Sequence, residues 1–446
     1  MSDTAQTVGR EATDLLSRYL RIDTTNPPGN ERPAAEWLRD QLRDHGIPDV
    51  SLYARDRNRP IVVARIPGDD NLKPLVLNHH LDVVPAVAED WTHAPFDGVI
   101  AEGYVWGRGA LDTKCLGIMH LLALARLIRE NATFRRPIIM LAVPDEEAGG
   151  RDGMEWLVDH HLAELDPEWV WDEGGYGVDD MIPGQVMMGV AVAEKCVQQY
   201  RVRVTGQPGH GAMPHGDMAP AALIQGLDRV LSPRPIRINP VMQRLCEALA
   251  DTMPFPASWM LRHMDNPLCR RLVGPKLASS GLLGAMMRDT ISLTQLSADS
   301  KINVIPAQAE AGLDCRLLPE TDPEAFREWL QERLNGHGST VTIERLSDSQ
   351  RASVSPLNNS FFGAIEAAVA NHVPNAVVVP LLMPGGSDAR FFRQRGIPAY
   401  GLAPAVIHQS ETRRVHGIDE RISIDNLVLG TNITYDIIRA LCVAET

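Results

Sequence analysis

The first third of the chain alternates between helix-like and strand-like spacings of its apolar side chains. Residues 9–21 and 32–45 repeat apolar positions every three to four residues, which predicts two amphipathic helices. Residues 115–130 are apolar nearly all round and predict a buried helix. Short apolar runs that predict strands lie at residues 61–66, 74–77, 137–143 and 168–171. Strands that alternate with helices predict an α/β fold with a mixed sheet covered by helices.

Near residue 196 the spacing changes. VQQYRVRV alternates apolar and polar side chains, which is typical of a half-exposed antiparallel strand. The patterns that follow predict a helix at 218–231, a Pro- and Met-rich stretch at 233–290, strands at 290–297 and 308–316, and a last helix at 423–441. We therefore predict a discontinuous α/β domain (1–195 and 320–446) and an inserted α+β domain (196–319).

Composition and charge narrow the class of protein. The 446 residues are 44% hydrophobic and 22% charged, which is ordinary for a globular chain. Lys and Arg number 43 against 57 Asp and Glu, a formal net charge of -14. An acidic total disfavours a broad cationic surface, so neither nucleic acid nor a membrane is an expected partner.

The cysteines and the N-terminus bear on the compartment. The six cysteines are scattered singly without a CxxC pair, which argues against a thiolate zinc site and against a disulfide framework. The first twenty residues are polar and no run of about 18 apolar residues occurs, so we expect neither a signal peptide nor a membrane span. These features favour a cytoplasmic protein.

Ionisable side chains gather where the predicted strands end. The residues are His79, His80, Asp82, Asp145, Glu146, Glu147, Asp172 and Glu173. In open α/β sheets, ligands bind outside the carboxyl ends of the strands. Such a crowded acidic pocket repels itself unless cations neutralise it, and His with Asp or Glu is the ligand set of zinc and similar divalent metals. Each cluster taken alone is equally an ordinary solvated loop.

Spacing divides the roles within two of these clusters. Residues two apart on a strand share a face, so His80 and Asp82 point the same way and His79 points the other. A metal-bound imidazole usually donates its second N–H to a carboxylate, a role open to Asp82. Of the adjacent Glu146 and Glu147, one would coordinate metal and the other would act as general base.

Six segments then carry a resemblance to a known family. They are NHHLDVVPA, DWTHAPFDG, VWGRGALDTK, VPDEEAGG, WDEGG and VHGIDERI, in this order between about residues 78 and 422. Together they resemble metallopeptidase family 20, the dinuclear zinc amidohydrolases that include aminoacylase-1, carboxypeptidase G, carboxypeptidase S and succinyl-diaminopimelate desuccinylase. The resemblance implies a zinc-exopeptidase-like catalytic domain and an inserted lid and dimerisation domain.

The resemblance also implies a metal centre of two Zn²⁺ ions, for which Co²⁺ or Mn²⁺ would substitute. The implied ligands are His80, Asp112, Glu147, Glu173 and His416, with Asp112 bridging the two ions and Asp172 as the alternative to Glu173. Asp82 would orient a metal-bound histidine, and Glu146 would be the general base and later the general acid. From local sequence alone, His416 also fits a surface loop, and Asp112 also fits a helix N-cap.

Further residues resemble parts of a substrate site. His210, in GQPGHGAMPHG, resembles the histidine that stabilises the oxyanion, which comes from the partner subunit in dimeric members. Asn303 and Arg316 resemble the pair that binds the substrate's carboxylate, although Arg316 also suits an ion pair with Asp314. Backbone N–H groups of Gly385, Gly386 and Ser387 would meet the same carboxylate, unless MPGGSDARFF is a plain turn before a helix.

We therefore expect an enzyme, a homodimer that hydrolyses an amide bond next to a free carboxylate. The implied mechanism uses a metal-bridged hydroxide with Glu146 as general base, and the substrate would be a peptide or an N-acyl amino acid. Two alternatives stay open. The first is a catalytically silent metal-dependent binding protein on the same fold, and the second is a hydrolase of a non-peptidic amide or carbamate.

Overall fold

The chain folds into two compact units. The computed structural model describes residues 3–69, 71–298, 301–335, 340–347, 351 and 353–444. The first unit comprises Met1–Val192, Val354–Leu381 and Ser387–Thr446, and the second comprises Ala193–Ser353 and Leu382–Gly386. The two units are described separately below.

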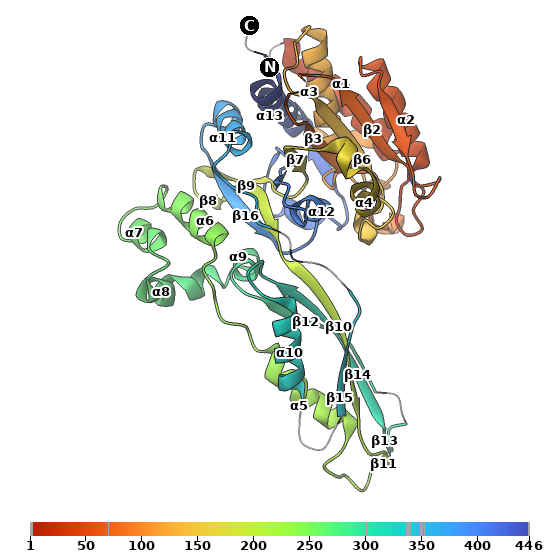
Figure 1. Cartoon of the computed structure of the whole chain (residues 1–446), viewed down its shortest axis with the longest axis vertical. Helices are drawn as coiled ribbons and strands as arrows, with labels where there is room; N and C mark the ends of the chain where they lie inside the picture. Colours follow the sequence, from red (N-terminus) through yellow and green to blue (C-terminus); the bar gives the residue numbers. More distant parts are fainter. Residues whose placement is uncertain are drawn as a thin grey trace. The chain divides into compact units, whose positions relative to one another are not determined.

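A mixed sheet forms the centre of the first unit (Figure 1). Its order is β1-β2-β6-β3-β7-β17-β9-β8-β18, with β16 also paired to β9. The strands are β1 (Val50–Tyr53), β2 (Ile61–Ile66), β3 (Leu75–His80), β6 (Ile138–Val143), β7 (Trp169–Asp172), β8 (Gly177–Ile182), β9 (Gln185–Glu194), β16 (Ala376–Met383), β17 (Ala399–Gly401) and β18 (Val406–Ile407). β3 runs parallel to both β6 and β7, so the carboxyl ends of these three strands meet at one edge.

Helices cover the sheet, which confirms the predicted fold class. They are α1 (Asp3–Leu20), α2 (Arg32–Asp44), α3 (Lys114–Arg129), α4 (Met154–Leu165), α11 (Ser360–His372), α12 (Ala389–Arg393) and α13 (Ile424–Cys442). The nearly all-apolar α3 packs between α1, α13 and strand β3, so its side chains are buried almost all round. Leu157 of α4 and Phe392 of α12 pack in one core cluster with Ile139 and Val170 of the sheet.

A small sheet in the first unit joins distant parts of the chain. It consists of β4 (Val99–Ala101), β5 (Tyr104–Trp106) and β19 (Arg421–Ser423), in the order β19-β5-β4. Because β19 pairs with β5, the segments just before Arg421 and just after Trp106 lie beside each other. Two of the motifs found in the sequence are in these segments.

The second unit is an antiparallel sheet with helices on one face. Its order is β12-β14-β10-β15, where β10 is Cys196–Thr205, β12 Thr290–Ser297, β14 Gln308–Leu317 and β15 Thr340–Arg345. Buried side chains alternate along β10 as its sequence predicts, and they pack against α5 (Ala219–Leu231) and α10 (Pro323–Leu334). The remaining elements are α6 (Pro240–Ala250), α7 (Ala257–Arg262), α8 (Pro267–Leu277), α9 (Gly281–Met286) and the two-stranded β11 (Gly209–His210) with β13 (Val304–Ile305).

The second unit extends beyond the insert predicted from the sequence. That prediction ended at residue 319, whereas α10 and β15 both lie in the second unit. β15 pairs with β10 from Tyr200 to Thr205, and α10 buries Phe326 and Leu330 in the core beneath that sheet. The segment from residue 320 to Ser353, which the sequence prediction gave to the first domain, therefore belongs to the second unit. Among the described residues, no helix is both long enough and apolar enough to cross a membrane.

Candidate metal centre

The sheet of the first unit delivers three polar clusters to one edge. His80 is the last residue of β3, and it lies opposite Val143, the last residue of the parallel β6. The Asp145–Glu147 turn follows β6, and Glu173 follows β7. The sequence predicted this convergence, and it depends on the parallel course of the three strands.

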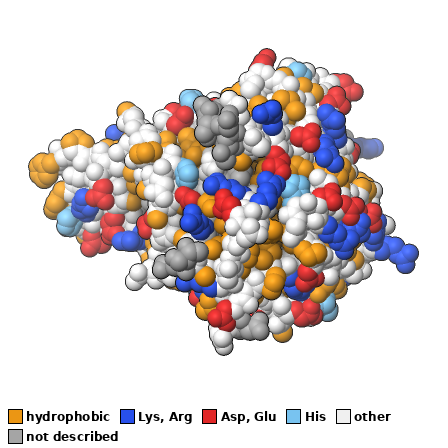
Figure 2. All heavy atoms as spheres, turned by 90° about the horizontal axis from the view of Figure 1, so that it is seen from above, with side chains coloured by type: hydrophobic (Ala, Val, Ile, Leu, Met, Phe, Trp, Pro, Cys, Tyr) orange, Lys and Arg blue, Asp and Glu red, His pale blue; other side chains and the backbone are white. Residues whose placement is uncertain are grey.

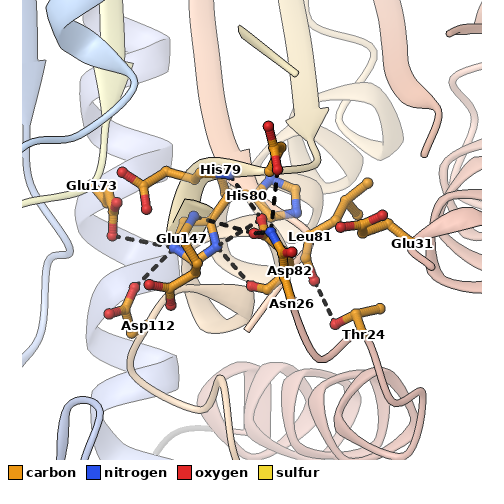
Figure 3. A network of polar contacts seen from close by, with 12 residues as sticks. Thr24, Asn26, Glu31, His79, His80, Leu81, Asp82, Asp112, Glu147 and Glu173 are labelled. Carbon is orange, nitrogen blue, oxygen red and sulfur yellow. Dashed lines mark hydrogen bonds and ion pairs between the residues drawn. The ribbon is translucent and has the colours of Figure 1, made fainter. Parts of the chain in front are cut away.

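Five side chains make two groups suited to metal ions, and the groups share Asp112. The first is His80, Asp112 and Glu173, and the second is Asp112, Glu147 and His416. In each group one ligand atom per residue lies within 4.8 Å of the others. Asp112 Oδ1 is 2.9 Å from His80 Nε2, and Asp112 Oδ2 is 3.0 Å from His416 Nε2. One oxygen thus faces each group, as in a carboxylate that bridges two cations. Figure 3 shows Asp112 beside His80.

Burial and close contact shift the pKa values of the histidines and carboxylates in these groups. Hydrogen bonds to Asp112 and Glu147 raise the pKa of His416 to about 10. Burial would lower the pKa of His80, but the carboxylates of Glu173 and Asp112 outweigh it and hold that pKa well above its usual value. Burial and the charge of Asp112 raise the pKa of Glu173. Imidazole and carboxylate donors that are this crowded fit a pair of divalent cations.

A strained turn presents the adjacent carboxylates Glu146 and Glu147. Asp145 has φ +73, the left-handed conformation that is uncommon for a residue with a Cβ. Arg59 stabilises this turn through an ion pair of 2.7 Å to the Asp145 carboxylate. Asp82 accepts hydrogen bonds of 3.1 Å from the backbone N–H groups of both Glu146 and Glu147. Asp82 therefore positions the turn that carries both glutamates.

Glu146 has surroundings that disfavour the ionised form of its carboxyl group. Burial, and next the charge of Glu173, raise its pKa well above the usual value. Arg390 lies 3.8 Å away and opposes this shift. Arg390 also donates to the carbonyl of Gly149 at 2.8 Å, so it connects the α12 region to the end of the glutamate turn.

Comparison with known proteins identifies the family. The model of peptidase family M20/M25/M40 matches residues 76–440. The chain belongs to this family. Human aminoacylase-1 is 30% identical over 431 residues, which are 96% of this chain and 94% of that protein. The M20 family metallo-carboxypeptidase Sso-CP2 from Sulfolobus solfataricus has a TM-score of 0.71 at 17% identity, over 96% of this chain and 98% of that one. A dinuclear metal-binding M20 peptidase from Bacillus subtilis has a TM-score of 0.59 at 14% identity, over 97% of each chain.

Membership in the M20 family confirms the resemblance predicted from the six motifs. It makes the chain a hydrolase that acts on amide or peptide bonds, and it makes that hydrolysis metal-dependent. The motifs are short, but their order and spacing match those of the family over most of the chain. This is why they identified the family.

Within this M20 peptidase, Asp172 and Glu173, which the sequence left open, differ in environment, and so do His79 and His80, which spacing placed on opposite faces of their strand. Asp172 turns away from the metal groups and accepts a hydrogen bond of 2.8 Å from Asn78, whereas Glu173 joins His80 and Asp112. His79 is fully buried on the opposite side of β3 from His80, and its Nε2 lies 3.2 Å from the Tyr19 hydroxyl.

Asp82 meets His80 differently from the prediction. The Nδ1 of His80 lies 2.8 Å from the backbone carbonyl of Asp82 and 3.8 Å from its carboxylate. The N–H of the ring therefore has a backbone acceptor, which leaves the carboxylate oxygens for the glutamate turn and for the Nδ2 of Asn26, 2.8 Å away. Figure 3 shows Asp82 between Asn26 and His80.

Glu420 is a residue of the site that sequence reasoning missed. It is fully buried, and its Oε1 accepts from the backbone N–H groups of Leu111 at 2.7 Å and of Asp112 at 3.0 Å. Its Oε2 accepts from the N–H of Gly109 and from the Arg108 guanidinium. Glu420 belongs to the VHGIDERI motif, which could have indicated it. The sequence analysis assigned a role only to His416 of that motif.

The predicted substrate residues His210, Asn303 and Arg316 all lie in the second unit. His210 is exposed on β11 and pairs with Val304 of β13, which places it beside Asn303. Arg316 lies on β14 and makes an ion pair of 2.6 Å with Asp314, the alternative partner considered from the sequence.

The MPGGSDARFF segment forms a bend followed by the helix α12. The bend includes Gly385, and α12 begins at Ala389. Ser387 is buried, and its carbonyl accepts from the backbone N–H of Arg390 at 3.2 Å and from its guanidinium at 3.0 Å. The segment therefore forms a turn before a helix, and the substrate role of Gly386 and Ser387 stays a prediction.

Proposed function

We propose that this M20 peptidase hydrolyses N-acyl amino acids with two divalent cations, most simply Zn²⁺. The observation that carries the proposal is the pair of ligand groups that share Asp112, one of its oxygens facing His80 and the other His416. His80, Glu173, Glu147 and His416 would complete the two sites. Cations bound there would polarise the amide carbonyl and lower the pKa of water. The aminoacylase-1 relatives favour an N-acyl amino acid over other amides.

Glu146 is our candidate for the proton-transferring group. Its carboxyl is buried beside the first ligand group, where Glu173 and burial raise its pKa. It would take a proton from the attacking water and later give it to the leaving amine. Asp82 supports this role, because it holds the backbone of Glu146 in the turn.

Arg316 is our candidate for the substrate's carboxylate, which its guanidinium would bind in bidentate geometry after leaving Asp314. Asn303 and His210 lie beyond the other end of the same strand. Arg316 is eight residues from Gln308 at that end, which at about 3.3 Å per residue is roughly 26 Å. One copy of the unit therefore does not place Asn303 and Arg316 on the same carboxylate.

We propose a homodimer in which His210 and Asn303 act on the partner's substrate. The region around them carries exposed apolar side chains that a second subunit would cover: Met213, Ile302 and Val304. The edge strand β12 also exposes Leu293 and Leu296. The six buried free cysteines support a reducing, cytoplasmic setting for this dimer.

Hydrolysis assays of the Zn²⁺-loaded protein test the activity. We expect turnover of N-acetyl amino acids, with slower turnover of dipeptides and of N-carbamoyl compounds. Equal or faster turnover of the carbamoyl compounds would assign the protein to the second alternative. Binding of the same ligands without turnover of any amide would leave the silent binding protein.

Glu146→Gln tests the base. Because the side chain keeps its shape and loses its proton-accepting oxygen, we expect kcat to fall by about two to four orders of magnitude while both metals stay bound. Metal content by mass spectrometry and the exposed control Glu89→Gln accompany the measurement. A kcat close to that of the unmodified protein would remove Glu146 from this role.

A further inference from the structure

One stretch of the second unit has a charge opposite to that of the whole chain. Residues 266–288 contain Arg270, Arg271, Lys276 and Arg288 and no acidic residue, in a chain of net charge -14. The stretch contains α8 and α9. The expectation of no membrane partner came from the net charge, which does not describe a local surface of this kind.

Helix α8 exposes leucines together with these cations. Leu268 is 64% exposed and Leu272 is 63% exposed, and they are four residues apart on one face of the helix. The opposite face buries Cys269 and Gly274. Arg271 lies three residues after Leu268, and Lys276 lies four residues after Leu272, so both residues extend the exposed face.

The preceding helix α7, which contacts α8, adds aromatic side chains. Phe255, just before α7, is 80% exposed, and Trp259 is 48% exposed and stacks on His263. Exposed Trp, Phe and Leu beside basic residues are typical of segments that lie in a membrane interface. In Figure 2, apolar side chains reach the surface at the left-hand end, where Figure 1 shows α7 and α8.

The cations of α8 are available to a ligand. Neighbouring arginines are neutralised, since Arg262 pairs with Asp251 and Arg244 pairs with Glu247. By contrast, no ion pair between described residues includes Arg270, Arg271 or Lys276. Arg271 and Lys276 flank the exposed leucines, so this surface is complementary to a face that is both anionic and apolar.

We propose that the α7–α8 surface, formed by Phe255, Trp259, Leu268, Arg271, Leu272 and Lys276, docks on anionic lipid membranes. A bilayer with acidic headgroups provides both properties, because the cations meet the headgroups while the apolar side chains enter the acyl boundary. A second copy of this chain is the alternative occupant of the exposed leucines, and light scattering of the variants separates it from a bilayer.

Vesicle binding by the full-length protein tests the proposal. Flotation is measured with vesicles of phosphatidylcholine alone and with vesicles containing about one third phosphatidylserine, at about 0.1 M salt. We expect at least tenfold tighter binding to the anionic vesicles, and loss of that preference at high salt. Equal binding to both vesicles, or no binding to either, would overturn the proposal.

Two variants locate the surface. Arg271→Glu with Lys276→Glu should abolish the preference for anionic vesicles, and Leu268→Ser with Leu272→Ser should weaken binding about tenfold. Arg10→Glu with Arg18→Glu, on the exposed face of α1, changes the charge equally and should leave binding unchanged. Thermal melts confirm that each variant is folded.

Other outcomes point to another occupant. If the variant of Arg271 and Lys276 binds anionic vesicles as tightly as the unmodified protein, the α7–α8 surface is not the lipid site. If the leucine variant changes the mass measured by light scattering and leaves vesicle binding intact, the leucines belong to a contact between subunits. Because these readouts do not depend on catalysis, they are separate from the test of the proposed hydrolysis.

Discussion

At the scale of single residues, neighbouring histidines of β3 have opposite surroundings. His80 faces carboxylates, whereas His79 is buried against Tyr19 and helix α3. A Cβ added to Gly117 of α3 would lie 2.3 Å from the Nε2 of His79. The glycine of α3 is therefore matched to the imidazole that β3 places against it.

We expect Gly117→Ala to destabilise the protein by about 1–3 kcal/mol, because the core must shift to admit the methyl group. His79→Ala in the same chain should remove most of this penalty, so the two free-energy changes should not add. Gly363→Ala, at an exposed position of α11 with no atom within 4 Å of the new Cβ, is the control. Denaturant unfolding is measured for the unmodified protein, the two single variants, the double variant and the control, and simple additivity would contradict the packing argument.

His416 makes metal binding depend on pH. Its pKa is raised to about 10 by Asp112 and Glu147, so the metal-free ring carries a proton at neutral pH. A cation binds only the neutral ring, so binding releases this proton and the affinity should rise with pH up to about 10. Titration calorimetry in two buffers of different protonation enthalpy counts the protons, and none released at pH 7 would contradict this expectation.

Single residues also show how far the sequence predicts the site. The metal-ligand candidates were predictable because the motifs mark them and parallel strands bring their ends together. The choice of Glu173 over Asp172 depended on Asn78, which hydrogen-bonds Asp172 across the sheet. The spacing of side chains along a single strand gives no information about this contact with another strand.

At the scale of elements, the loop before Asp112 and the loop after His416 are held as one piece. The pairing of β19 with β5 brings them together, and the Glu420 carboxylate accepts three backbone N–H groups from the first loop. This arrangement joins residues about 310 positions apart, so local sequence patterns do not predict it.

Glu420→Gln should weaken metal binding about 10- to 100-fold, because the new amide opposes N–H donors and the loop bearing Asp112 loses its anchor. Competition with a chelator measures the affinity. The neighbouring Asp419→Asn is a matched control, since Asp419 accepts from Thr92 instead of the Asp112 loop. A similar loss in both variants would contradict a specific role for Glu420.

Elements were predicted better than domain limits. Alternation along β10 and the apolar run of α3 are strong local signals, and both elements form where expected. The membership of α10 and β15 in the second unit depends on pairing with β10 more than a hundred residues earlier. A helix followed by a strand has the same sequence pattern in either unit, so this pattern does not show to which unit α10 and β15 belong.

At the scale of the whole molecule, the proposed exchange of His210 between subunits is testable by mixing inactive variants. Glu146→Ala and His210→Ala should each be inactive alone. A mixed dimer would have one complete site, formed by Glu146 of one chain and His210 of the other. Activity that appears after co-refolding the two variants is expected, and its absence from verified mixed dimers would show that His210 acts within its own chain or not at all.

The order of the ligands along the chain has a consequence for synthesis. His80, Asp112, Glu147 and Glu173 all precede the second unit, whereas His416 follows it. The ribosome therefore synthesises the whole second unit after the first four candidate ligands and before His416. Until His416 emerges, the nascent chain has an acidic pocket that lacks one imidazole. In the proposed two-cation centre, loading of the second cation would therefore come after synthesis of the whole second unit.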